Sequence, residues 1–161
     1  MKEIRRIELA NGPGMTVFGP DGRYGFVCSS FTPELAVVSM IVTKDSPMFD
    51  AIGGLHHIYV NSVGFSRLKK GGSTPYPDGT IFTDDVRDFS LADGSYSQGR
   101  RKAIPVMLKD AKQYASTGGW GFQAWAGGDP QKPLATDPVK TCFACYTAQK
   151  ANDYTFSTYL H

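Results

Sequence analysis

The chain has 161 residues, of which 41% are hydrophobic and 20% are charged, and its formal net charge is +2. A chain of this length and composition buries enough surface to fold as one compact domain, which excludes a disordered protein and one that depends on a dense disulfide framework. The small net charge argues against nucleic acid as a partner, and we expect a single domain over residues 1–161.

The first residues and the apolar stretches of the chain bear on its location. The first six residues are too polar for a signal peptide, which suggests a cytoplasmic protein or a processed domain behind a new Met. The longest apolar stretch, 35–42, is interrupted by Ser39 and is far shorter than the ~20 residues of a membrane-spanning helix. We therefore expect no membrane insertion.

Short β-rich runs between glycines and prolines predict the strands of an antiparallel sheet. In chain order these runs are 36–42, 55–60, 80–89, 102–108 and 119–125. Helices are predicted over 62–70, where Gly71 and Gly72 end the pattern, and from 140 to about 150. The sequence thus predicts an α+β domain in which one twisted antiparallel sheet carries a few helices on one face.

Turn residues and charges suggest which parts of the chain lie outside the core. The segments 75–79 and 91–94 both contain an Asp-Gly pair, and the first also contains two prolines. These are signatures of tight turns, so we expect both segments outside the core. On the run 80–89, strand alternation places Asp84 and Asp88 on one face and Asp85 on the other. A solvated sheet edge explains this acidic group better than a proton relay or a cation site.

The strongest chemical motif is the C-x-x-C pair Cys142-Phe143-Ala144-Cys145, which lies on the second predicted helix. Such a pair can bind zinc, act as a redox dithiol or attach haem. Zinc needs four ligands and the chain has no second cysteine pair, while a thioredoxin-like dithiol belongs early in a βαβ unit. Haem attachment fits the position better, but the residue that should be the ligating histidine is Tyr146.

Two adjacent histidines and several aromatic residues are further candidates for a site. His56 and His57 are neighbours on a predicted strand, so they point to opposite faces and cannot hold one metal ion together. No spacing in the chain supports a metal site, although one of the two histidines can still face a pocket. Aromatic side chains that could wall a haem-sized cavity, or simply pack the core, are Phe65, Phe82, Trp120, Phe122 and Trp125.

Several segments, taken together and in this order, resemble the cytochrome P-460 family of small periplasmic c-type haem proteins, which includes the cytochromes c′-beta. The matching segments are 55–61, 77–80, 106–110, 117–122, 142–145 and 153–158. The resemblance runs from about Phe31 to the end of the chain. It implies a β-rich fold around haem c, a periplasmic location, and chemistry on hydroxylamine or nitric oxide. In the hydroxylamine-oxidising members of the family, the haem is cross-linked to a lysine. The residues just after Asn61 in this chain contain no lysine.

The replacement of the ligating histidine by Tyr146 leaves two interpretations. In the first, the haem site is lost, and the domain binds another small molecule or has an unknown activity. Cys142 and Cys145 then form a disulfide, and Cys28 is the single thiol. In the second, Cys142 and Cys145 carry haem c with Tyr146 or another altered axial ligand, and the protein binds nitric oxide or oxidises hydroxylamine. The sequence leaves open whether the protein is an enzyme, whether it has a redox partner, and whether it is a homodimer.

Overall fold

The computed structural model describes residues 13–18, 25–29, 35–46, 49–137, 139–157 and 159. The chain divides into two compact units, Met1–Leu35 and Ala36–His161. In the first unit, β1 (Pro13–Phe18) and β2 (Gly25–Ser29) form an antiparallel pair that the sequence analysis does not predict. A single domain over the whole chain stays a prediction.

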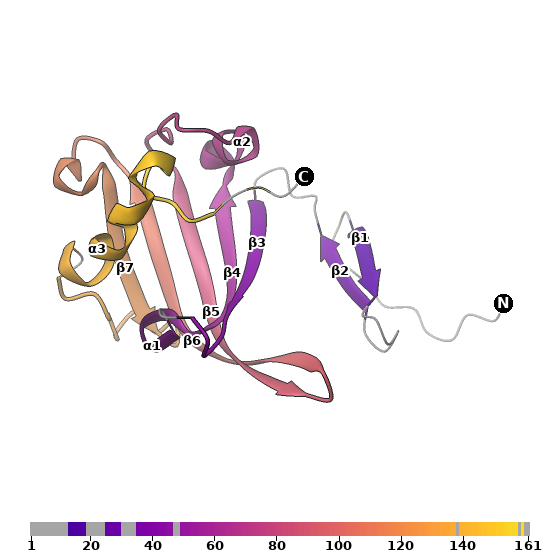
Figure 1. Cartoon of the computed structure of the whole chain (residues 1–161). Coiled ribbons are helices and arrows are strands. Elements are labelled where there is room, and N and C mark those ends of the chain that lie inside the picture. Colours follow the sequence, from indigo (N-terminus) through magenta and orange to yellow (C-terminus); the bar gives the residue numbers. More distant parts are fainter. Residues whose placement is uncertain are drawn as a thin grey trace. The chain divides into compact units, whose positions relative to one another are not determined.

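The second unit is built on one open antiparallel sheet of five strands (Figure 1), as the sequence predicts. The strands lie side by side in chain order. They are β3 (Leu35–Val42), β4 (Gly54–Asn61), β5 (Ile81–Ala92), β6 (Ser95–Lys109) and β7 (Trp120–Ala126). The α+β fold class expected from the sequence is therefore confirmed, and the five strands match the five predicted runs to within a few residues, apart from the longer β5–β6 hairpin.

The helices of this unit are short. They are α1 (Phe49–Ile52), α2 (Ser62–Lys70), the 3₁₀ turn η1 (Ala115–Thr117), the π-helical turn η2 (Val139–Phe143), α3 (Ala144–Tyr146) and the 3₁₀ helix η3 (Thr147–Asn152). The last three follow one another without a break, and we call residues 139–152 the C-terminal helical segment. Figure 1 shows this segment, in orange and yellow, lying across one face of the sheet near β7. None of the helices that the structure describes is long and apolar enough to cross a membrane.

Local chemistry explains the bounds of α2. The Asn61 side chain accepts a hydrogen bond from the backbone N–H of Gly64, which caps the first turn. At the other end, Gly71 adopts a φ of 67° and its N–H donates to the carbonyls of Arg67 and Leu68. A second predicted feature, the turn at Asp93 and Gly94, closes the β5–β6 hairpin with positive φ at both residues.

The core of the second unit lies on the face of the sheet that the C-terminal helical segment covers. Its buried members are Val60, Leu68, Tyr76, Phe82, Met107, Trp120 and Phe122. The expectation that the whole segment 75–79 lies outside the core is wrong at Tyr76, whose ring packs edge-on against Phe82 at 5.2 Å between centroids. Arg67 lies over the same ring at 4.5 Å. Burial of a large aromatic ring outweighs the turn chemistry of its neighbours at this position.

The acidic group of β5 also departs from expectation, because β5 is the central strand of the sheet and has no solvated edge. Asp85 accepts hydrogen bonds from the guanidinium groups of Arg87 and Arg101, which hold the pKa of this carboxyl below its usual range. Asp84 points to the face that carries the core, where its carboxylate meets His56. Only Asp88 is exposed.

Candidate functional site

A cavity of about 700 Å³ lies between the sheet and the C-terminal helical segment. This volume is in the range of small-molecule and cofactor sites. Its apolar floor includes side chains from four neighbouring strands, among them Ile58, Phe82, Met107 and Phe122. The opposite wall consists of Cys142, Cys145, Tyr146 and Phe156. The motif that carries the sequence-based prediction thus borders this cavity.

The helical segment presents both thiols to the same cavity. Cys142 lies in the π-helical turn η2 and Cys145 in α3, one turn further on. The turn η2 begins at Val139, and the side chain of Asp137 accepts a hydrogen bond from the Lys140 N–H in its first residues. No disulfide joins Cys142 and Cys145, so the disulfide expected for a haem-free chain is not formed in this structure. The side chain of Cys28 lies outside the described residues.

Tyr146 lies on the cavity wall with its ring between two other aromatic rings. The ring centroids of Phe122 and Phe156 are 5.1 Å and 5.3 Å from that of Tyr146. Burial raises the pKa of Tyr146 to about 12, and the Asp84 carboxylate and the two cysteines add to the increase. No cation in the described part of the chain lowers this pKa. The phenol is therefore protonated throughout the physiological pH range.

At one end of the cavity floor, His56 and Asp84 form a close polar pair. His56 on β4 is 2% exposed, and its Nδ1 lies 2.6 Å from Asp84 Oδ2 on β5. The other ring nitrogen, Nε2, donates to the carbonyl of Ile52 at 2.7 Å. Burial lowers the pKa of His56, but the hydrogen bond to Asp84 and its charge outweigh burial, so that the pKa lies above its ordinary value. A protonated imidazole can donate to both of these acceptors at once.

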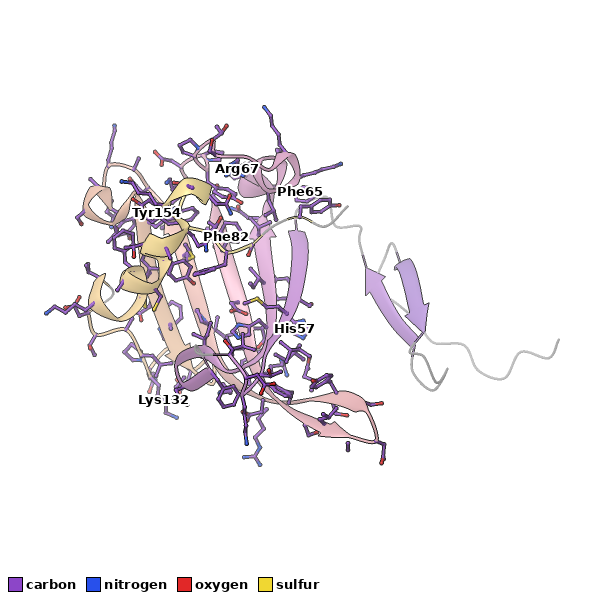
Figure 2. All side chains as sticks on the ribbon, viewed as in Figure 1. His57, Phe65, Arg67, Phe82, Lys132 and Tyr154 are labelled. Carbon is purple, nitrogen blue, oxygen red and sulfur yellow. The ribbon has the colours of Figure 1, made fainter. Side chains whose placement is uncertain are left out.

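The other aromatic and histidine candidates are divided between the cavity and other places. Phe82, Phe122 and His56 line the cavity, whereas Phe65, Trp120 and His57 are not among its lining residues. His57 is on the opposite face of β4, where it contacts the Ser39 hydroxyl and Gln98. Figure 2 shows Phe82 on the sheet face near the helical segment, and Phe65 on α2 at the end of the sheet.

The structure adds two charged residues to the site that the sequence analysis does not select for it. Asp84 is paired with His56 from 28 residues away, and only the strand register reveals this contact. Lys102 on β6 also lines the cavity, and its ammonium group donates to the Gly53 carbonyl at 2.6 Å. Strand alternation places Asp84 on one defined face, but the sequence does not say that this face carries a cavity.

A buried ion pair anchors the end of the helical segment to the sheet. Lys109 Nζ lies 2.9 and 3.0 Å from the two carboxylate oxygens of Asp153, and both side chains are less than a tenth exposed. Asp153 also accepts the backbone N–H of Tyr76, and its own carbonyl accepts the indole N–H of Trp120. These contacts hold the residues just after the segment against β6 and β7, and they keep the cavity wall in place.

Comparison with known proteins places this architecture in a family. The family model described as Cytochrome P460 matches residues 31–157, which is most of the chain and includes every residue of the cavity described above. None of the curated proteins matches the chain. On the family match, the chain belongs to the cytochrome P460 family.

Proposed function

We propose that this protein is a haem-free member of its family that binds a small, mainly apolar molecule in the cavity. The observation that carries the proposal is the state of Tyr146, which occupies the position of the expected haem ligand. Its phenol is half-buried between aromatic rings, and its pKa is raised to about 12. The proposal includes a periplasmic location, which is what the resemblance to the periplasmic c-type haem proteins of this family implies.

The residues present fit only part of a c-type haem. Two thiols one helical turn apart face an apolar floor, which is the arrangement that two thioether bonds and a flat macrocycle need. The iron ligand does not fit. A tyrosine binds ferric haem as phenolate, which calls for a nearby cation, but the groups around Tyr146 favour the protonated form. We therefore derive no chemical step through haem.

The haem-free proposal is tested by expression with export to the periplasm in a strain equipped for c-type maturation. Wild type and a Tyr146→Phe control should be colourless and have the mass of the polypeptide alone. Tyr146→His restores the missing imidazole and should give a protein with covalent haem, seen by intact mass and by absorption after acid-acetone extraction. A wild-type protein that carries the mass of a haem would overturn the proposal.

Ligand binding needs its own test, with 2-methoxynaphthalene as an apolar probe and calorimetry as the readout. Ala124 lines the cavity, and Ala124→Phe should fill part of it and weaken probe binding at least about tenfold, by loss of apolar contact. Ala148 is exposed on η3 and is not part of the cavity, so Ala148→Phe serves as the matched control. Equal binding by both variants would place the probe elsewhere and contradict the proposed site.

A second candidate function is a c-type haem protein with tyrosine ligation, which binds nitric oxide or oxidises hydroxylamine. The observation that favours it is the presence of Cys142, Cys145 and Tyr146 on one wall of one cavity. In that case the wild type carries covalent haem, and its absorption spectrum changes in Tyr146→Phe. A loaded wild type whose spectrum is unchanged by Tyr146→Phe would exclude ligation by the phenol.

A further inference from the structure

The Asp84 carboxylate has acceptor capacity that the protein does not use. It lines the cavity, and 18% of its side chain is exposed. One oxygen, Oδ2, accepts the hydrogen bond from His56, while Oδ1 is buried and has no hydrogen-bond partner among the described residues. An ionised carboxylate offers about four acceptor positions, and a buried acceptor left unused is costly. A ligand donor that meets the exposed part of this carboxylate can use the acceptor positions that the protein leaves open.

His56 determines the orientation of the Asp84 carboxylate. The Ile52 carbonyl can only accept, so Nε2 of His56 must carry a hydrogen, and Nδ1 donates to Asp84. His56 is almost completely buried and therefore supports Asp84 from behind the cavity surface. It acts as a positioning residue, since its two hydrogen bonds hold the carboxylate in one orientation.

The charges at this end of the cavity favour a neutral ligand. His56 balances the charge of Asp84, and Lys102 adds a further positive charge nearby, which is seen in its lowering effect on the pKa of His56. A cationic ligand would meet this excess of positive charge. An anionic ligand would meet the Asp84 carboxylate. Beyond these groups, the floor consists of apolar side chains such as Ile58 and Val86, which suit a flat hydrocarbon body.

We infer that Asp84 is the recognition group of the cavity and accepts a hydrogen bond from neutral, flat, mainly apolar molecules that carry one hydroxyl or N–H group. This inference rests on the proposed function, because it requires a ligand other than haem in the cavity. The ligand body lies between the apolar floor and the wall of the helical segment, and its donor group points to Asp84.

Three probes with the same naphthalene body separate the possibilities by calorimetry near neutral pH. They are 2-naphthol, a neutral donor; 2-methoxynaphthalene, which cannot donate; and 2-naphthoate, an anion. A hydrogen bond to a charged acceptor predicts that 2-naphthol binds roughly ten- to a hundredfold more tightly than 2-methoxynaphthalene. Asp84→Asn can still accept from His56 but presents an amide donor to the cavity, so this ratio should fall to near one. Asp88→Asn, at an exposed position further along the same strand and outside the cavity lining, should keep it.

The outcomes distinguish this inference from the proposed function. If the wild type binds 2-naphthol and 2-methoxynaphthalene equally, Asp84 is not the recognition group, but the binding cavity stands. If 2-naphthoate binds most tightly, Lys102 selects the ligand and the inference is also overturned. If no probe binds the wild type, the proposed function fails and the inference fails with it. The wild-type ratio decides the matter even if Asp84→Asn does not fold, and a shift of the His56 imidazole NMR signals with 2-naphthol alone would support it.

Discussion

Replacing Asp153 with Asn removes the anion that ties the end of the helical segment to the sheet. Asp153 meets Lys109 Nζ through both carboxylate oxygens, and its side chain is 8% exposed. The backbone is a minor factor, because Asn tolerates the positive φ of 49° at this position as well as Asp does. Loss of one partner leaves the Lys109 ammonium buried without its counter-ion, which costs about 3–5 kcal/mol in comparable pairs.

We expect the lower end of that range, about 3 kcal/mol, for two reasons. The Asn side-chain oxygen still accepts the Tyr76 N–H, and Lys109 keeps its hydrogen bond to the Gly118 carbonyl and its position 4.9 Å above the Trp120 ring. The double variant with Lys109→Met removes the unpaired charge. It should therefore be less destabilised than the sum of the two single variants.

Urea unfolding, followed by tryptophan fluorescence, measures these free energies. The matched control is Asp129→Asn, which breaks the ion pair with Lys132, whose two side chains are 39% and 70% exposed. That variant should lose less than about 1 kcal/mol. If Asp153→Asn loses no more than Asp129→Asn, the Lys109 pair is hydrated in solution and the argument from burial is wrong.

The remaining predictions concern two titrating groups and one glycine. Because the pKa of Tyr146 rises to about 12, the free energy of unfolding should fall between pH 10 and about 12, where the native state holds the proton longer, and Tyr146→Phe should lessen this fall in urea titrations at each pH. The raised pKa of His56 contributes stability that is complete below about pH 6.5 and is lost as pH rises through the native value, which NMR titration of the imidazole will locate. Gly118→Ala combines a φ of 66° with a Cβ 2.2 Å from the Tyr154 ring, so it should lower the free energy of unfolding by more than about 2 kcal/mol in thermal unfolding. Gly79→Ala, with a positive φ but open space around the Cβ, should lower it by about 1 kcal/mol. Equal losses would show that the Tyr154 ring moves aside.

Local sequence signals predict much of the fold. The helix over 62–70 has its N-cap at Asn61 and its stop at Gly71, and both operate within a few residues of the helix itself. The same is true of the Asp93-Gly94 turn, which defines the β5–β6 hairpin. Alternation also places His56 and His57 on opposite faces of one strand, as the structure has them.

Contacts between distant residues account for what the sequence does not reveal. The carboxylate of Asp84 meets His56 across 28 residues, and Asp153 meets Lys109 across 44 residues and Tyr76 across 77. A turn signature around Tyr76 cannot show that its ring fills the core. Nor can the acidic residues Asp84, Asp85 and Asp88 show that their strand lies in the middle of the sheet. The register between strands and the packing of distant segments decide these positions. Neither can be inferred from a few neighbouring residues.

The division of the cavity between two distant parts of the chain has a consequence for synthesis. The floor comes from residues 56–107 and 122, while the wall with both thiols comes from residues 142–157. Chains are synthesised from the amino terminus at about 5–20 residues per second, so the strands of the sheet exist before the segment that covers them. Until the ion pair between Asp153 and Lys109 forms, the apolar floor faces water. A nascent or truncated chain therefore exposes an apolar surface that chaperones and proteases recognise. The segment 142–157 thus decides whether the apolar floor of the sheet is covered or stays exposed to proteases.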